Sequence, residues 1–128
     1  MKLLLDTHLL LWAAGPSPHL TAKARLLIDD RDNELWFSVA SVWETAIKSA
    51  LRRPDFRVEP LPFRLNLLNN GYRELAITGE HAAAVAGLPL LHRDPFDRIL
   101  VAQSIVEGIM LLTTDPLVAQ YPAPVRRV

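Results

Sequence analysis

The stretch Lys2-Leu3-Leu4-Leu5-Asp6 decides the fold of this chain. A short apolar run that ends at a carboxylate is typical of a strand buried on both faces, as in a parallel sheet covered by helices. Ligands of such sheets bind in the crevice at the carboxyl ends of the strands. We therefore expect a buried strand at Lys2–Leu5 and a functional role for Asp6 at its end.

Beyond this strand, helical and strand-like patterns alternate along the chain. The expected helices cover residues 7–14 (ended by Gly15-Pro16), 18–30, 38–51, 61–68, 78–86, 94–107 and 115–120. The expected further strands cover residues 34–39, 73–77, 109–113 and, at an edge, 123–128. This alternation predicts an α/β protein with a mainly parallel central sheet. We expect a single domain over residues 1–128, since the length suits one core and no repeat or long linker interrupts it.

Composition restricts the class of protein. Half of the 128 residues are hydrophobic and 22% are charged, which is typical of a globular chain. No apolar run approaches the roughly 20 residues of a membrane span, and the first residues lack a signal-peptide cleavage pattern. The absence of cysteine excludes disulfides and thiolate sites, so we expect a cytoplasmic protein without membrane contact. The net charge is zero, so a nucleic-acid ligand would need local arginine clusters, a bound metal or a partner subunit.

Acidic residues from segments far apart in the sequence fall where an α/β fold has its ligand site. They are Asp6 after the first strand, Glu44 inside the helix 38–51, Asp94 and Asp97 at the start of the helix 94–107, and Asp115 after the strand 109–113. The aspartates at 6, 94 and 115 each precede a helix, so each is also consistent with an N-cap. A capping aspartate keeps a free carboxylate oxygen, so both roles are compatible.

Glu44 is different because it lies more than one turn inside its helix and is not a cap. Its alternative role is a surface ion pair with Lys48, four residues on, worth about 0.3–0.5 kcal/mol. Gathered carboxylates raise one another's pKa, and a divalent cation offsets that cost. Oxygen ligands without cysteine indicate Mg²⁺, with Mn²⁺ as a substitute, and the chemistry of phosphodiester hydrolysis.

Four groups of motifs follow one another along the chain in a specific order and spacing. They are Leu3-Leu4-Leu5-Asp6-Thr7-His8, Ser38-Val39-Ala40-Ser41-Val42-Trp43-Glu44 with Ile47-Lys48, His92-Arg93-Asp94-Pro95-Phe96-Asp97-Arg98 with Leu100-Val101-Ala102-Gln103, and Leu112-Thr113-Thr114-Asp115. Together they resemble the PIN-domain family, and within it the VapC-type toxins of type II toxin–antitoxin pairs. The resemblance covers nearly the whole chain.

This resemblance implies a three-layer α/β/α sandwich and an Mg²⁺-dependent endoribonuclease that hydrolyses RNA. It also implies a homodimer and a small antitoxin protein as partner. Carried over by position, the catalytic acids are Asp6, Glu44, Asp97 and Asp115. The metal is held by the aspartates at 6, 97 and 115, with Asp94 as the alternative to Asp97.

Other residues near these motifs have two possible roles each. Those that would bind the substrate or hydrogen-bond the site are Thr7, Lys48, Arg93, Arg98 and Thr113. Their alternative roles are local caps and ordinary charge pairing, and Arg52-Arg53 would contact either RNA or antitoxin. A metal–carboxylate site needs no histidine, so His8 and His92 are expected outside the chemistry. Trp12, Trp36 and Trp43 are expected to fill the core or a dimer interface.

Two other classes of protein remain as alternatives. A phosphatase with Asp6 as nucleophile usually has a second aspartate two residues on, whereas this chain has His8 there. A catalytically silent PIN-like scaffold or binding module is opposed by the full set of acids. A receiver-like domain needs a lysine late in the chain, and the last lysine here is Lys48.

Overall fold

The computed structural model describes residues 1–15 and 17–128, and within these residues the chain forms a five-stranded parallel sheet. The strands are β1 (Lys2–Leu5), β2 (Glu34–Ser38), β3 (Arg73–Leu75), β4 (Met110–Thr113) and β5 (Val125–Arg127). Their order is β3-β2-β1-β4-β5, and every adjacent pair is parallel. The first strand of the sequence is therefore the central strand of the sheet, and β5 lies at an edge as predicted.

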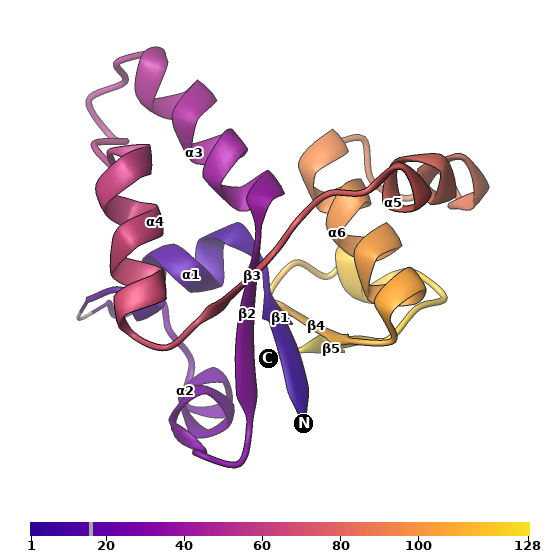
Figure 1. Ribbon diagram of the computed structural model, residues 1–128, viewed down its shortest axis with the longest axis horizontal. Coiled ribbons are helices and arrows are strands. Elements are labelled where there is room, and N and C mark those ends of the chain that lie inside the picture. The colour runs from indigo at the N-terminus through magenta and orange to yellow at the C-terminus, as the bar shows by residue number, and fades with distance from the viewer. Residues whose placement is uncertain (16) are drawn as a thin grey trace.

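Helices cover both faces of this sheet. They are α1 (Thr7–Ala13), α2 (Ala22–Asp29), α3 (Val39–Ala50), α4 (Pro60–Asn69), α5 (Gly79–Ala84) and α6 (Pro95–Glu107), with short 3₁₀ turns η1 (Val85–Gly87) and η2 (Val118–Gln120). Figure 1 shows α1, α2 and α4 on one side of the strands and α5 and α6 on the other. The predicted three-layer α/β/α sandwich is thus confirmed. Among the described residues, no helix combines the length and the apolar character needed to cross a membrane.

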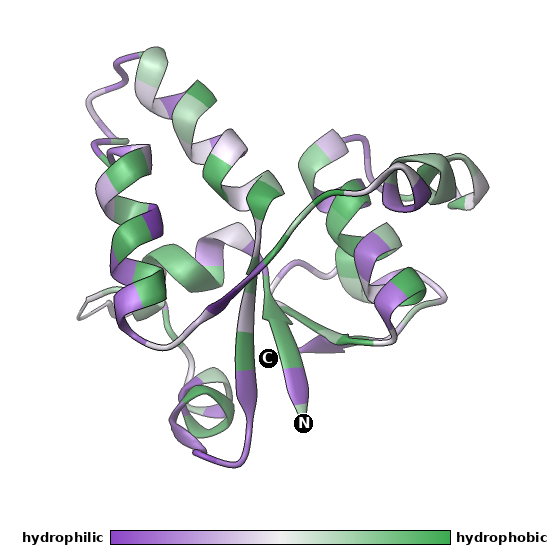
Figure 2. Ribbon diagram, viewed as in Figure 1, coloured by the Kyte–Doolittle hydropathy of each residue, from purple (hydrophilic) through white to green (hydrophobic). Residues whose placement is uncertain are grey.

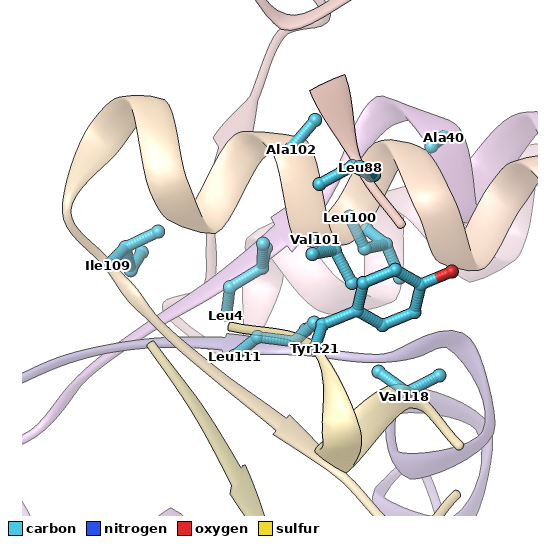
Figure 3. Close-up of a cluster of buried hydrophobic side chains, with 10 residues drawn as sticks. All are labelled: Leu4, Ala40, Leu88, Leu100, Val101, Ala102, Ile109, Leu111, Val118 and Tyr121. Carbon is cyan, nitrogen blue, oxygen red and sulfur yellow. The ribbon is translucent and has the colours of Figure 1, made fainter. Parts of the chain in front are cut away.

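Two apolar clusters lie on the two faces of β1. Leu4 packs on one side against α6, in the cluster drawn in Figure 3. Tyr121 is also a buried member of this cluster. Leu3 and Leu5 point to the other side, toward Phe63 of α4. Successive side chains of a strand alternate between faces, so a strand that is apolar at every position is buried on both. Figure 2 shows this strand green beyond its first residue. Each fully buried leucine contributes about 1.5–3 kcal/mol.

Some predicted boundaries differ from the observed ones. The helix expected over residues 18–30 begins at Ala22, because the Thr21 hydroxyl accepts the Ala24 N–H at 3.1 Å and caps it. Residues 115–120 form only the turn η2 rather than a full helix. Of the expected stop at Gly15-Pro16, Pro16 lies outside the described residues, and α1 already ends at Ala13.

Candidate active site

Asp6 lies where the chain changes its direction of travel through the sheet. After β1 the chain adds β2 and β3 on one side, then returns to add β4 and β5 on the other. Leu5 pairs with Leu112, so Asp6 faces Thr113 across the carboxyl ends of the two central strands. Such a switch point forms the ligand-binding crevice of an open α/β sheet.

The Asp6 carboxylate acts as a cap and also contacts Thr113 at the end of β4. Its Oδ1 accepts the N–H of Leu9 at 2.9 Å, which caps α1, and its Oδ2 accepts the Thr113 hydroxyl at 2.7 Å. Burial raises the pKa of Asp6, against the lowering effect of these two hydrogen bonds, and the charge of Asp115 raises it further. The two roles that the sequence left open therefore coincide in one side chain.

Glu44 is brought to the same edge by α3, which begins directly after β2. Its carboxylate is buried, with the Thr7 hydroxyl 2.7 Å from Oε1 and the Lys48 ammonium 2.6 Å from Oε2. Thr7 also lies 2.9 Å from Ser41 Oγ. Because Thr7 has one hydroxyl proton, donation to Glu44 leaves it to accept from Ser41. The predicted ion pair with Lys48 is therefore present, but on a buried carboxylate rather than on the surface.

The buried face of α3 is unexpectedly polar. Its fully buried positions are Ala40, Ser41, Glu44 and Thr45. The hydrophobic residues Trp43 and Ile47 are instead 57% and 41% exposed. The hydrophobic pattern of this helix therefore does not identify its inner face, which carries polar groups that reach the end of the sheet.

Asp97 enters the site from the first turn of α6. Its carboxyl is half-buried, and this burial, reinforced by the charge of Asp94, raises its pKa to about 7. The charges of Asp6 and Glu44 act in the same direction, whereas His92 opposes them. Asp6, just after β1, and Glu44 of α3 therefore lie close enough to Asp97 for their charges to disfavour its ionisation.

The carboxylate of Asp94 has a different role from that of Asp97. Its Oδ1 accepts the N–H of Phe96 at 2.8 Å, so it caps α6, with Pro95 at the first helical position. The sequence left the choice between these two aspartates open. The contacts favour Asp94 as the cap and Asp97 as the member of the acidic cluster.

Asp115 completes the group together with His92, which was expected from the sequence to lie outside the chemistry. His92 Nε2 lies 3.0 Å from Asp115 Oδ2 and 3.3 Å from Asp97 Oδ2, and one atom of each residue falls within 4.8 Å of the others. Burial acts to raise the pKa of Asp115, but hydrogen bonds from Leu117 N–H and His92 lower it overall. No local pattern predicts this placement of His92, because contacts with distant Tyr121 fix its loop.

The chemistry of the donors fits a hard divalent cation. Asp6, Asp97 and Asp115 present carboxylate oxygens at one edge of the sheet, and these are the ligands that Mg²⁺ and Mn²⁺ prefer. The raised pKa values of Asp6 and Asp97 show that negative charge at this place is unfavourable without a counter-ion. A bound cation would relieve that cost.

The remaining predicted site residues take different places. Thr7 and Thr113 donate to acids of the site, and Lys48 pairs with one of them. Arg98 instead donates to the backbone carbonyls of Pro89 and Val85, at 3.0 and 3.3 Å, contacts that favour a structural role. Arg93 lines an apolar cavity between α3 and α6.

The tryptophans were expected to fill the core or a dimer interface; the core expectation is wrong for Trp43, whereas Trp12 and Trp36 are partly buried and pack against the two apolar clusters. Trp43 is 57% exposed and packs edge-to-face on Phe96, with ring centroids 5.1 Å apart. Trp12 stacks between His8 and His19 near the surface, at 5.6 and 5.3 Å. Trp36 is only half-buried, with two cationic side chains over its ring.

A parallel α/β/α sandwich with a cluster of acidic residues at the switch point defines the class of this protein. The chain belongs to the PIN domain family, whose model matches residues 3–123. It is 30% identical over 125 residues to Ribonuclease VapC22 of Mycobacterium tuberculosis, and the match covers 95% of each chain. The resemblance inferred from the motifs is thereby confirmed.

Solved structures show the same fold. A toxin–antitoxin complex, VapBC2 of Rickettsia felis bound to a promoter DNA fragment, contains a chain that matches with a TM-score of 0.70 at 14% identity, covering 99% of this chain and 98% of that one. A toxin–antitoxin complex from Klebsiella pneumoniae matches with a TM-score of 0.63 at 15% identity, covering 98% of each chain. At such identities the likeness establishes the shared fold alone.

Proposed function

We propose that this protein is a metal-dependent endoribonuclease that hydrolyses RNA phosphodiester bonds and acts as the toxin of a toxin–antitoxin pair. The observation that carries the proposal is the group of acids at the switch point of the sheet: Asp97 lies close to Asp115, the charges of Asp6 and Glu44 act on Asp97, and that of Asp115 acts on Asp6. A relative is named as a ribonuclease, and chains of this fold occur in toxin–antitoxin complexes. Both similarities support the proposal.

In this proposal Asp6, Asp97 and Asp115 hold Mg²⁺, with Mn²⁺ as a substitute. The cation, when bound, supplies Lewis-acid stabilisation of charge on the phosphate and the departing oxygen. Thr113 orients Asp6 through its 2.7 Å hydrogen bond. Glu44, held at both carboxylate oxygens, positions the attacking water.

RNA reaches this edge along a basic cavity beside Glu44. The cavity measures about 400 Å³, and its lining includes Lys48, Arg53 and Arg57 against one acid, Asp55. Figure 2 shows the loop after α3 largely purple, the colour of hydrophilic residues. Because the net charge of the chain is zero, this local cluster supplies the phosphate attraction that the composition lacks.

The basic cavity has its own test. Replacing both Arg53 and Arg57 by alanine is expected to raise KM for RNA about tenfold and to flatten its salt dependence, while kcat changes little. Steady-state cleavage at several salt concentrations measures this. An unchanged KM would place the RNA elsewhere.

The partners of this proposal are a small antitoxin and a second copy of this chain. The homodimer is supported by the apolar cavity that Trp43, Phe96 and Ile99 line between α3 and α6. A symmetric dimer would cover the exposed face of Trp43. Light scattering of wild type and Trp43→Asp is expected to show a dimer and a monomer respectively. The cytoplasmic location remains a prediction.

The central test compares RNA cleavage by wild type, Asp6→Asn and Asp97→Asn, with Mg²⁺ and with EDTA. Both variants and EDTA are expected to abolish cleavage, because each removes the cation or one of its ligands. Full activity of a folded Asp6→Asn protein would end the proposal. Metal binding by wild type without cleavage of any RNA would favour a silent scaffold, and a trapped phospho-aspartate would favour a phosphatase.

A further inference from the structure

We infer that His92 is a positioning residue, which holds Asp115 in place for the cation by donating to it from Nε2, with Asp97 Oδ2 3.3 Å away, and does not itself bind the cation. The inference deepens the proposed function and rests on it, because it assigns these two acids to the metal. By distance alone, His92, Asp97 and Asp115 look like three ligands of one ion. The hydrogen bonds of the ring argue otherwise.

The contact of Nδ1 decides which ring nitrogen carries the proton. Nδ1 of His92 lies 3.1 Å from the backbone nitrogen of Asp94 and accepts its N–H. A nitrogen that accepts a hydrogen bond carries no proton of its own. In the neutral ring the proton is therefore on Nε2, which faces Asp115 Oδ2 at 3.0 Å.

A ligating imidazole needs the opposite arrangement. The nitrogen that binds a metal offers its lone pair, and the other nitrogen donates its N–H to a carboxylate, carbonyl or water. In this site that tautomer would place Nδ1–H against the N–H of Asp94, two donors face to face. His92 is therefore set up to support the carboxylates that bind the cation.

The position of the ring is fixed by elements on either side. The N–H of His92 donates to the Tyr121 hydroxyl at 2.9 Å, and Arg98 donates to the same hydroxyl at 3.2 Å. Asp94, whose N–H holds Nδ1, is itself fixed as the cap of α6. The ring therefore links the end of β4, which carries Asp115, to the start of α6. This also accounts for the structural contacts of Arg98.

Metal binding without RNA tests the inference. Calorimetric titration of wild type, His92→Ala and His92→Gln with Mg²⁺, Mn²⁺ and Zn²⁺ is expected to show equal weakening in the alanine variant. The loss is about 10–100-fold for each ion, as for other supporting residues of metal sites. The glutamine variant, whose amide N–H reaches the place of Nε2–H, is expected to recover most of the affinity.

Two outcomes of this titration overturn the inference. A selective loss of Zn²⁺ affinity with Mg²⁺ and Mn²⁺ affinity spared would make the ring a ligand, because imidazole suits Zn²⁺ better than it suits those two harder ions. A folded His92→Ala protein that binds Mg²⁺ as tightly as wild type would leave the residue a merely structural role. Circular dichroism verifies that each variant is folded.

A spectroscopic readout is independent of cleavage. The ¹⁵N shifts of the His92 ring are expected to report the Nε2–H tautomer both in EDTA and at saturating Mg²⁺. A change to the Nδ1–H tautomer on adding Mg²⁺ would contradict the inference. A protein that shows the expected His92 dependence but cleaves no RNA would refute the ribonuclease proposal alone. A protein that cleaves RNA while His92→Ala binds Mg²⁺ normally would refute the inference alone.

Discussion

His81 and His92 sit near opposite ends of α6 and make the same kind of contacts. Nδ1 of His81 accepts the N–H of Thr78 at 3.0 Å, and its Nε2 lies 2.8 Å from Glu107. His92 repeats this with the N–H of Asp94 and the carboxylate of Asp115. His81, however, is fully buried against a single acid, whereas His92 is partly exposed and lies between two acids.

The difference between the two histidines shows when a histidine–carboxylate pair belongs to a functional site and when it only stabilises the fold. His81 closes a capping box at the start of α5 and ties that helix to the end of α6 through Glu107. At the other end, Asp97 and Asp115 come from different elements and lie with His92 in a group whose ligand atoms are within 4.8 Å of one another. A histidine–carboxylate pair therefore indicates function only where further acids converge on it.

The largest expected effect comes from removing a negative charge at one end of α6 or the other. Asp97→Asn is expected to lower the rate of RNA cleavage at least about 1000-fold, because the site loses a metal ligand. Glu107→Gln, the matched change near His81, is expected to leave the rate within about twofold, because it touches only the structural pair. Single-turnover cleavage assays measure both. Similar losses in the two variants would remove the functional distinction between the ends.

Replacing each histidine by alanine should separate stability from metal binding. His81→Ala is expected to lower the free energy of unfolding by about 2–3 kcal/mol. The change opens a cavity and leaves the Thr78 N–H and the Glu107 carboxylate without their hydrogen-bond partner. Its Mg²⁺ affinity is expected to stay within about twofold of wild type. His92→Ala should cost only about 1 kcal/mol of stability, since its ring is part-exposed. Urea unfolding and calorimetry check this order, and its reversal would contradict the comparison.

The raised pKa of Asp97 predicts how metal-free stability changes with pH. This carboxyl titrates near pH 4 when unfolded and at about 7 when folded, so the folded state holds the extra proton between these values. The free energy of unfolding therefore falls as pH rises from about 4 to about 7. In EDTA at pH 8, Asp97→Asn is expected to raise Tm by about 3–6 °C, and the gain should shrink toward pH 4.

Two checks accompany this thermal series. Saturating Mg²⁺ is expected to stabilise wild type and to cancel or reverse the advantage of Asp97→Asn, because only the carboxylate binds the ion. Glu107→Gln serves as the control and should show no gain in EDTA. A Tm of Asp97→Asn below that of wild type at pH 8 in EDTA would mean that burial of the charged Asp97 carboxylate does not destabilise the fold.

The smallest effect concerns the cap next to His92. Asp94→Asn keeps the capping oxygen and the backbone N–H that holds the histidine, so Mg²⁺ affinity should change less than about threefold. Calorimetry on this variant beside Asp97→Asn decides between the two aspartates. A loss comparable to that of Asp97→Asn would make Asp94 a ligand instead.

The local features of the fold were predictable because they depend on neighbouring residues. The apolar run Lys2–Leu5 indicated a strand buried on both faces, and Asp94-Pro95 indicated the start of α6. The aspartates of the site were predictable as a set, since each follows a strand or opens a helix. Contacts within a few residues carry this information, so periodicity and capping chemistry reveal it.

The inner face of α3 and the tryptophans were not predictable in this way. Hydrophobic pattern favours burial of Trp43 and Ile47, yet both are exposed, and Glu44 is buried instead. The polar face is stable because Thr7, 37 positions away, and Lys48 satisfy the carboxylate. Such compensation depends on the neighbours that a helix meets in the fold.

The sequence by itself determined the central strand, the alternation of strands and helices and the acids at the strand ends, because these follow from local order along the chain. Only the tertiary structure decided that Thr113 donates to Asp6, 107 positions away, and that His92 stands between Asp97 and Asp115. Those contacts join separate segments through loops whose course is set by distant partners such as Tyr121. A pattern of neighbouring residues does not predict these long-range contacts, because the segments that make them come together only once the sheet has formed.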